Sequence, residues 1–251
     1  MNVLVFGATG MIGQGVLREC LLDPGVGRVV VIGRQHTGMK SDKLRDVVQA
    51  DVTDLSALEG ELRLVDACLF CLGVSSAGMS EERYTRLTYD LTLSVARTLA
   101  RVNPDVVFVY VSGMGTDSTE HGRVMWARVK GRTENALLAL RFRAAYMFRP
   151  GFVQPVAGAR SKTVWYRALY TLTTPLMPLV KRSFPKYVTT TEEIGRAMLA
   201  VSRRGYEKAV LESRDITRVA RNTIPLEQPA QHIRGHGEFH IAPPRLRKRK
   251  K

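Results

Sequence analysis

The sequence predicts an α/β fold with a doubly wound parallel sheet, and three observations support this prediction. An apolar, β-branched run at residues 2–6 is followed by glycines at positions 7, 10 and 13 and by an apolar-periodic run at residues 11–22. This order is expected for a buried strand, a tight turn and a helix. Strand-like and helix-like segments then alternate to residue 155, which is typical of a parallel sheet covered by helices on both faces.

Each glycine of the first turn can have a separate role. Gly7 permits the sharp turn after the strand, Gly10 permits close approach of the backbone to a pyrophosphate, and Gly13 permits the helix to pack near the strand. The N-terminus of that helix offers N–H groups and a partial positive charge to phosphates. The pattern therefore predicts a Rossmann dinucleotide-binding domain, with a glycine-rich turn that binds no ligand as the alternative. The residues predicted to contact the cofactor in this turn are Gly7, Thr9, Gly10, Met11, Ile12 and Gly13.

The end of the second predicted strand, at residues 28–33, concerns the choice of cofactor. In dinucleotide-binding folds an acidic residue about twenty positions after the glycines binds the ribose of NAD, whereas arginine suits the 2′-phosphate of NADP. Arg34 occupies this position, and Lys40 and Lys43 follow it. The sequence therefore favours NADP, with NAD as the second choice. A solvated loop arginine is the alternative interpretation of Arg34.

A short third strand is predicted at residues 47–53, with a helix from residue 54. Asp51 and Val52 lie at the end of this strand, and both are assigned to the cofactor site. The Asp51 carboxylate could accept a hydrogen bond from the adenine amino group or cap the following helix. The sequence does not separate these two roles.

The fourth predicted strand, at residues 67–73, is apolar on both faces, as expected inside a parallel sheet. Ligands of open α/β sheets bind beyond the carboxyl ends of the strands. Cys71, Leu72 and Gly73 lie at this end and are therefore predicted to contact the cofactor. A capped helix is expected next, over residues 82–102.

The following segments complete the predicted sheet. We expect a fifth strand at residues 106–111, a helix at 124–140 and a sixth strand at 144–149, which leads into the loop 150–155. These elements close the dinucleotide-binding core, which we assign to residues 1–155.

The pattern changes after residue 155. We expect broken apolar helices at residues 161–179 and a short strand that enters a helix capped by Thr190 or Thr191. A last strand is expected at residues 209–211, so residues 156–212 are assigned to a small substrate-covering subdomain with the last sheet elements. Periodicity is lost at residue 213, and residues 213–251 are predicted to be a mobile basic tail.

Charge and cysteine content narrow the class of protein. The net charge is +15, and the sequence ends in RLRKRKK. Such a balance can attract nucleic acid, an anionic membrane or phosphorylated ligands, but nothing else resembles a nucleic-acid module. The three cysteines lie in apolar segments without a pairing or metal-ligand pattern, and we find no signal peptide. We therefore expect reduced thiols, no metal and a cytoplasmic protein. No apolar run reaches the length of a membrane span.

Seven short motifs carry a resemblance to a known family. They are GATGMIGQG at residues 7–15, IGR at 32–34, ADV at 50–52, FCLG at 70–73, VSG at 111–113, VKG at 129–131 and RPGFVQP at 149–155. Over roughly four fifths of its length the chain resembles the extended or atypical branch of the short-chain dehydrogenase/reductase superfamily. That branch includes nucleotide-sugar epimerase-like proteins and oxidoreductases similar to the human Tat-interacting protein.

The resemblance implies catalytic roles near the end of the fifth strand. In the family a serine there binds the substrate carbonyl oxygen. A lysine on the next helix binds the nicotinamide ribose and lowers the pKa of a tyrosine four positions earlier. Ser112 and Lys130 match the serine and the lysine, but Trp126 stands at the tyrosine position. The family tyrosine transfers the proton that accompanies hydride transfer, which an indole N–H cannot do near neutral pH. The loop that the family places under the nicotinamide corresponds to Pro150, Gly151 and Val153.

Trp126 leaves three interpretations open. The chain binds a cofactor without chemistry, or its substrate takes a proton from water or another residue, or another side chain replaces the tyrosine. Histidine titrates near neutral pH, so His121 is one candidate, and Tyr84 and Tyr89 are others.

The expected function is that of an NADP-preferring oxidoreductase-like protein acting on a small carbonyl or sugar-like substrate. The alternative is a non-catalytic dinucleotide-binding redox sensor or regulator. The expected partner is a small-molecule substrate, with a monomer or homodimer and no specific nucleic acid. The apolar residues 165–179 lie where the family carries substrate-covering elements, so their aromatic side chains suggest an apolar substrate pocket or lid. Ordinary core packing is the simpler interpretation, and contact with a membrane surface is the third.

Overall fold

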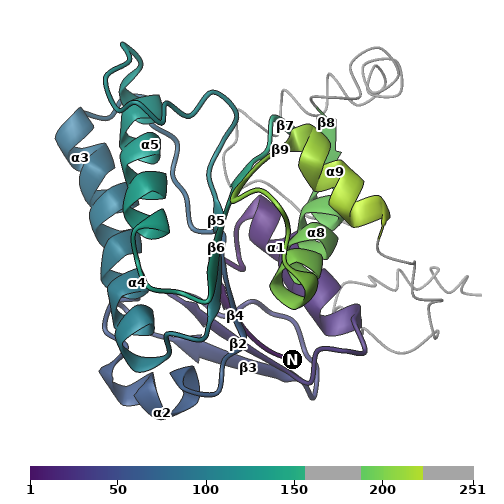
Figure 1. Cartoon of the computed structure of the whole chain (residues 1–251). Helices are drawn as coiled ribbons and strands as arrows, with labels where there is room; N and C mark the ends of the chain where they lie inside the picture. Colours follow the sequence, from purple (N-terminus) through teal and green to yellow (C-terminus); the bar gives the residue numbers. More distant parts are fainter. Residues whose placement is uncertain (156–187, 223–251) are drawn as a thin grey trace, which may run out of the picture.

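A seven-stranded parallel sheet forms the centre of the computed structural model, which describes residues 1–155 and 188–222 (Figure 1). The strands lie in the order β3-β2-β1-β4-β5-β6-β9, and every neighbouring pair is parallel. Their bounds are β1 (Asn2–Phe6), β2 (Arg28–Gly33), β3 (Leu44–Val48), β4 (Ala67–Phe70), β5 (Val107–Val111), β6 (Ala144–Arg149) and β9 (Val210–Glu212). The strand order reverses beside β1, so the sheet is doubly wound and the predicted fold class is confirmed.

Helices cover both faces of the sheet (Figure 1). One layer contains α1 (Met11–Leu22), α8 (Thr191–Arg204) and α9 (Ser213–Arg221). The other contains the 3₁₀ turn η1 (Ser56–Leu58), α2 (Glu59–Leu62), α3 (Glu81–Thr85), the π-helical turn η2 (Arg86–Asp90), α4 (Leu91–Val102) and α5 (Met125–Leu138). Val3 and Val5 belong to the core under the first layer, and Leu4 and Phe6 to the core under the second. Alternate side chains of one strand are therefore buried on opposite faces, which explains the continuous apolar runs.

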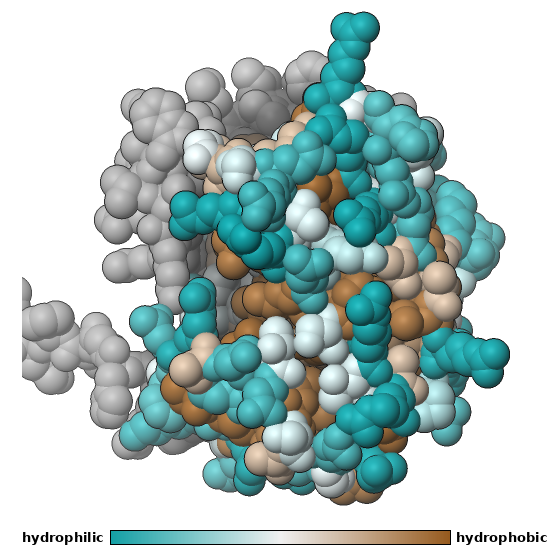
Figure 2. Space-filling model, turned by 90° about the vertical axis from the view of Figure 1, so that its left-hand side faces the viewer, coloured by the Kyte–Doolittle hydropathy of each residue, from teal (hydrophilic) through white to brown (hydrophobic). Residues whose placement is uncertain are grey.

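The segments α3, η2 and α4 follow one another without a break, as predicted for residues 82–102. Ser80 caps the start of this segment by accepting a hydrogen bond from the N–H of Arg83 at 3.3 Å. Figure 2 shows the outer face of this layer, where hydrophobic residues are interleaved with hydrophilic ones. Leu87 and Leu138 are among the exposed apolar residues of these helices.

Helix α8 packs closely along α1, which places residues 191–204 beside the first helix of the chain. Gly15 and Gly195 leave no side chain at the contact between the two helices, and a Cβ at either position would collide with the partner helix. Arg203 and Asp23 form an ion pair of 2.7 Å at the far end of both helices. Thr190, one of the two predicted caps, caps α8 in a capping box.

The third strand ends earlier than predicted. β3 spans Leu44–Val48, whereas the predicted strand covered residues 47–53. Asp51 Oδ1 instead accepts hydrogen bonds from the N–H and the hydroxyl of Thr53 at 2.9 and 2.7 Å. Aspartate and threonine compete for backbone groups in this way and end a strand that hydrophobicity alone would continue.

The mobile tail predicted from residue 213 is wrong at its start, because Ser213–Arg221 form α9. This helix buries Ile216, Val219 and Ala220 on one face and exposes Arg214 and Arg218 on the other. It has too few apolar residues for its periodicity to be evident. Residues 223–251 and the predicted apolar helices at 161–179 lie outside the described residues.

A second, two-stranded parallel sheet joins β7 (Phe152–Gln154) to β8 (Val188–Thr190). It ties the loop after β6 to the start of α8. In the parts of the chain that are described, no helix is long and apolar enough to cross a membrane. The three cysteines are free, as predicted.

Candidate functional site

Three glycines shape the turn between β1 and α1. Gly7 has a φ of +77°, and a Cβ there would lie 2.6 Å from the carbonyl carbon of Cys71. A Cβ on Gly13 would overlap the carbonyl oxygen of Gly7. No side chain caps α1 at Gly10, and its first turn contains no acidic residue. The positive end of the helix dipole is therefore uncompensated by any side chain of this turn, which suits an anion.

The loops that follow the parallel strands meet at one edge of the sheet (Figure 1). The N–H of Cys71 donates to the carbonyl of Phe6 at 2.9 Å, and the N–H of Met114 donates to the carbonyl of Pro150 at 3.0 Å. The structure thus brings most of the predicted cofactor residues to this edge. They are Gly7, Thr9, Gly10, Met11, Ile12, Gly13, Cys71, Leu72, Gly73, Pro150, Gly151 and Val153.

The three basic residues after β2 that were considered for a 2′-phosphate differ in their surroundings. Arg34 and Lys40 are exposed beyond the end of the strand. Lys43 instead donates from Nζ to the carbonyl of Asp23 at 2.9 Å, at the C-terminal end of α1. Of the basic residues considered for a 2′-phosphate, Arg34 and Lys40 therefore remain available, and Lys43 does not.

Asp51 and Val52 differ in their surroundings. Asp51 is exposed and does not cap the next helix, because its carboxylate binds Thr53. These hydrogen bonds lower the pKa of the Asp51 carboxyl. Val52 is buried in the core under α2 and α4. The side chain of Val52 is thus a packing residue, so only its backbone can face a ligand.

Ser112 is held at the end of β5 by a second hydroxyl group. Its Oγ lies 3.0 Å from Oγ1 of Thr116, and Thr116 donates its hydroxyl hydrogen to the carbonyl of Gly113 at 2.7 Å. A hydroxyl has one hydrogen, so Ser112 is the donor in the bond between the two hydroxyls. The oxygen lone pairs of Ser112 then face outward from this bond as acceptors. The spacing of four residues was the only sequence signal for Thr116, and it was missed.

Lys130 and Trp126 lie one helical turn apart on α5. Nζ of Lys130 lies over the ring of Tyr110, 5.3 Å from its centroid, and Tyr110 is on the same side of β5 as Ser112. The indole of Trp126 lies beside Gly113 and Gly115, where added Cβ atoms would be 4.0 and 3.6 Å from it. The three predicted catalytic residues, Ser112, Trp126 and Lys130, are therefore grouped around the end of β5.

The environment of the Lys130 amine changes its acidity. Burial lowers the pKa of Lys130 from its ordinary value of 10.5 to about 8, and the charge of Glu134 opposes this shift. Among the described residues no acidic group forms an ion pair with Lys130. The amine therefore exchanges a proton much closer to neutral pH than an exposed lysine does.

Glu134 belongs to a buried ion pair that the sequence did not suggest. Its side chain is 1% exposed, and its carboxylate accepts hydrogen bonds from Nε of Arg149, at 3.0 Å to Oε1, and from Nη2 of Arg149, to Oε2. Arg149 also donates to Ser118 Oγ at 2.6 Å. The hydrogen bonds with Glu134 raise the pKa of Arg149. The pair joins α5, β6 and the loop before α5, and the only sequence signal was an arginine before Pro150.

The substitutes considered for the missing tyrosine lie elsewhere. His121 is exposed and borders a hollow between α3 and α5 with Arg128 and Arg132, on a side of α5 away from Lys130. The ring of Tyr89 is covered by the guanidinium of Arg132 at 4.2 Å. Tyr84 is buried, and burial raises its pKa. None of these side chains is a suitable acid at the end of β5.

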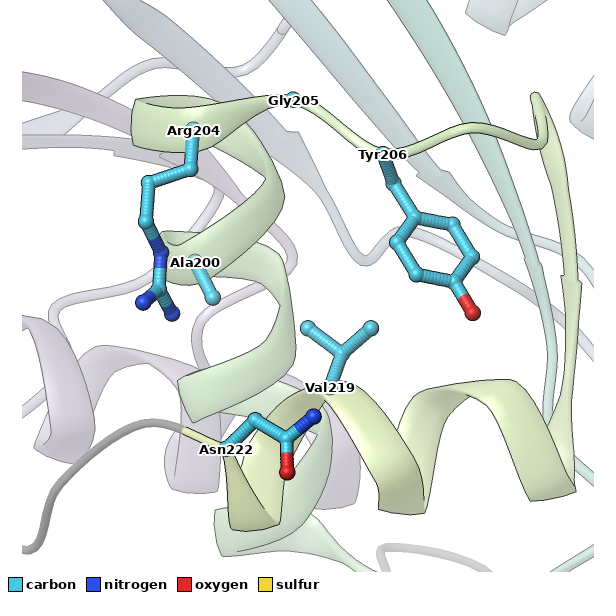
Figure 3. A pocket seen from close by; sticks show the side chains of 6 residues that line it. All are labelled: Ala200, Arg204, Gly205, Tyr206, Val219 and Asn222. Atoms are coloured by element: carbon cyan, nitrogen blue, oxygen red, sulfur yellow. The ribbon is translucent and has the colours of Figure 1, made fainter.

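A second hollow lies at the opposite end of the α1–α8 pair (Figure 3). It is formed by the last turn of α8, the loop after it and the end of α9. Its lining residues are Ala200, Arg204, Gly205, Tyr206, Val219 and Asn222. Arg203, the neighbour of Arg204, pairs with Asp23 at the end of α1, so this hollow is remote from the glycine turn.

The geometry defines a Rossmann-type protein with a built site at the carboxyl edge of its sheet, and known proteins agree with this class. The model of the NAD dependent epimerase/dehydratase family matches residues 3–125. Protein fmp52, mitochondrial, of Emericella nidulans is 30% identical over 169 residues, which cover 64% of this chain and 70% of that protein. Protein FMP52, mitochondrial, of Saccharomyces cerevisiae is 28% identical over 229 residues, which cover 86% and 95%.

A solved structure shares the fold. MoeE5 in complex with UDP-glucose and NAD superimposes with a TM-score of 0.60 and 16% identity, covering 89% of this chain and 82% of that one. The chain belongs to the family of the FMP52 proteins. Its match to the NAD dependent epimerase/dehydratase model agrees with the resemblance to atypical, epimerase-like short-chain dehydrogenases/reductases that the sequence motifs predicted.

The predicted cytoplasmic location is wrong by the same comparison. The FMP52 relatives of several fungi are named mitochondrial. Free cysteines indicate a reducing environment, but they do not distinguish one reducing compartment from another. The prediction therefore exceeded its physical basis.

Proposed function

We propose that this chain binds an adenine dinucleotide along the carboxyl edge of its sheet. The observation that carries the proposal is the uncapped start of α1, where the glycine turn allows a diphosphate to reach the backbone. The family match and the NAD bound to MoeE5 support it. The residues that would hold the cofactor are Gly7, Thr9, Gly10, Met11, Ile12, Gly13, Arg34, Asp51, Val52, Cys71, Leu72, Gly73, Lys130, Pro150, Gly151 and Val153.

We propose that NADP is preferred over NAD. The support is Arg34, an exposed arginine at the position where an acid would bind the ribose of NAD. Fluorescence titration with NADPH and NADH tests the preference directly. Tighter binding of NADH would overturn it without affecting the proposal that a dinucleotide binds.

We propose further that the bound cofactor, which supplies hydride chemistry at its nicotinamide, acts on a small carbonyl or sugar-like substrate. Ser112 would bind the substrate oxygen in its alcohol form, by accepting the hydrogen bond of the alcohol, and Lys130 would bind the nicotinamide ribose, with Trp126 beside them. The grouping of these residues at the end of β5 supports the proposal, as does the UDP-glucose bound to MoeE5. Oxidation of NADPH by a panel of aldehydes, ketones and nucleotide sugars tests it, and Ser112→Ala should abolish that oxidation.

The second candidate is a non-catalytic protein that binds the dinucleotide and reports redox state to a partner. Trp126 favours it, because the family tyrosine that moves the proton is missing. Binding of NADPH without turnover of any compound in the panel would support this function. Turnover lost in Ser112→Ala would exclude it.

A further inference from the structure

The position on α5 that holds the proton-donating tyrosine in the family holds Trp126 in this chain. Carbonyl reduction nevertheless needs a proton at the substrate oxygen. Trp126 occupies the relevant turn of α5, and its indole N–H can donate a hydrogen bond but cannot release its proton near neutral pH. Its ring lies beside Gly113 and Gly115, so it fills the space next to Ser112. If the chain is catalytic, water or another side chain must supply the proton, and the side chains at this edge of the sheet can be compared.

The other groups near this edge are unsuitable in the described parts of the chain. Burial raises the pKa of Tyr110 far above neutrality and that of Cys71 to about 12. Glu134 is bound by Arg149. The hydroxyl hydrogen of Ser112 is directed to Thr116, and a serine hydroxyl is in any case too weak an acid. One side chain remains as a candidate: the amine of Lys130, one helical turn after Trp126 on α5.

We propose that Lys130 itself transfers the proton, in place of the missing tyrosine. Lys130 lies on the same face of α5 as Trp126, and its amine lies over Tyr110, two residues before Ser112 on the same side of β5. The amine and the Ser112 hydroxyl therefore flank the same strand end. This inference rests on the proposed function, because it needs a bound nicotinamide and a substrate.

The step balances with the reduced dinucleotide as the only co-reactant. The substrate carbonyl accepts a hydride from the reduced nicotinamide at its carbon and the proton of the Lys130 ammonium at its oxygen. The carbonyl is reduced to an alcohol, the nicotinamide is oxidised, and Lys130 is left as a neutral amine that regains a proton from water. Ser112, whose lone pairs are free of the bond to Thr116, accepts a hydrogen bond from the new alcohol.

The surroundings of Lys130 allow this role. Glu134 on its own helix is close enough to favour the ammonium, but Arg149 of β6 neutralises that carboxylate. Tyr110 of β5 and Tyr84 of α3 stay neutral because burial raises the pKa of both. The elements η2 and α4 also pack against α5. Their charged residues are exposed to solvent; they are Arg86, Asp90, Arg97 and Arg101. Desolvation therefore dominates, and it favours release of the proton.

The experiment compares the full-length wild type with Lys130→Met, Lys130→Arg and the exposed control Arg97→Met. Titration of the lysine ¹³Cε resonances by NMR reports the protonation of Lys130 directly, with Lys130→Met for assignment and Lys40 as an exposed reference. NADPH binding is measured by fluorescence. NADPH oxidation with 4-nitrobenzaldehyde as the probe is followed in single turnovers across pH.

We expect Lys130 to titrate near pH 8 and the rate of aldehyde reduction to fall as pH rises through that value, because reduction needs the ammonium. Lys130→Met should lose this pH dependence and about 100-fold in rate. Lys130→Arg should bind NADPH but not restore the rate, because arginine keeps its proton. Arg97→Met should behave as the wild type.

Each outcome decides between the claims. Absence of binding of both NADPH and NADH overturns the proposed function, and binding without aldehyde reduction overturns catalysis and this inference together. Turnover whose pH dependence survives in Lys130→Met overturns this inference alone. The same holds if Lys130 titrates at the ordinary lysine pKa of 10.5, a measurement on the wild type for which either Lys130 variant can supply the assignment.

Discussion

The candidate site has two parts that are built differently, the glycine turn after β1 and the strand end after β5. At the first, backbone geometry defines the site, since Gly7 and Gly13 occupy positions where a Cβ would meet backbone atoms. At the second, side chains define it, through the Ser112–Thr116 bond, the Lys130 amine and the Glu134–Arg149 pair. A backbone site tolerates no change at a few positions. A side-chain site can lose one group, such as the family tyrosine, and still keep its framework.

Removing the buried carboxylate at the β5 end should have the largest effect. Glu134→Ala leaves the Arg149 guanidinium largely buried without its main partner, and breaking such a pair costs about 3–5 kcal/mol. Urea unfolding followed by circular dichroism measures the loss. The double variant Glu134→Leu/Arg149→Met should recover much of the stability, because it removes both charges. A single variant that unfolds at the wild-type midpoint would show that the pair does not support this half of the site.

The matching change in the first region is Gly13→Ala. Its Cβ would overlap the carbonyl oxygen of Gly7, so we expect a loss of about 3 kcal/mol and of NADPH binding measured by calorimetry. Gly60→Ala in α2 is the control, because a Cβ there meets nothing within 4 Å and alanine favours the helix. Unchanged binding in Gly13→Ala would mean that the turn does not need its close approach.

The same contrast explains how far the sequence could predict the molecule. Strands β1, β2 and β6 and helix α1 match their predicted bounds, because apolar runs and glycines are local signals. Helix α9 and the end of β3 were missed, because a short amphipathic helix and an Asp51–Thr53 turn depend on few residues. Lys43 was expected near the cofactor but caps α1, and only the folded chain brings these elements together.

The side-chain half of the site was less predictable for the same reason. Ser112, Trp126 and Lys130 could be located by motif, but the motif says nothing of the acidity of Lys130. The lowered pKa of Lys130 arises from its burial over Tyr110, which outweighs the opposing charge of Glu134, and Glu134 is itself paired with Arg149. These residues are far apart in the sequence, from Tyr110 to Arg149. Their proximity is a result of the β5–β6 pairing.

A smaller effect, on the choice of cofactor, is expected from Arg34, the side chain near the glycine turn that would contact the 2′-phosphate. Arg34→Glu places a carboxylate where the 2′-phosphate of NADP would lie, so we expect affinity for NADPH to fall by about 10-fold or more and affinity for NADH to change little. Parallel fluorescence titrations measure both constants. Lys43→Glu is not a suitable control, because Lys43 caps α1. Arg63→Glu is suitable, because Arg63 is exposed at the end of α2, before the start of β4 and so at the opposite edge of the sheet from the glycine turn. Equal loss for both nucleotides would place the 2′-phosphate elsewhere.

The smallest expected effect is a gain in stability, and it concerns a side chain at the end of β5. Tyr110 is 1% exposed, and its Oη has no hydrogen-bond partner among the described residues. A buried hydroxyl without a partner is costly, so Tyr110→Phe should raise the free energy of unfolding by up to about 1 kcal/mol, as measured by urea denaturation. The ring remains under Lys130, so the ¹³Cε titration of Lys130 should stay where it is in the wild type. A loss of stability would show instead that the hydroxyl binds water inside the layer, and the end of β5 would then be a hydrated polar site rather than a dry one.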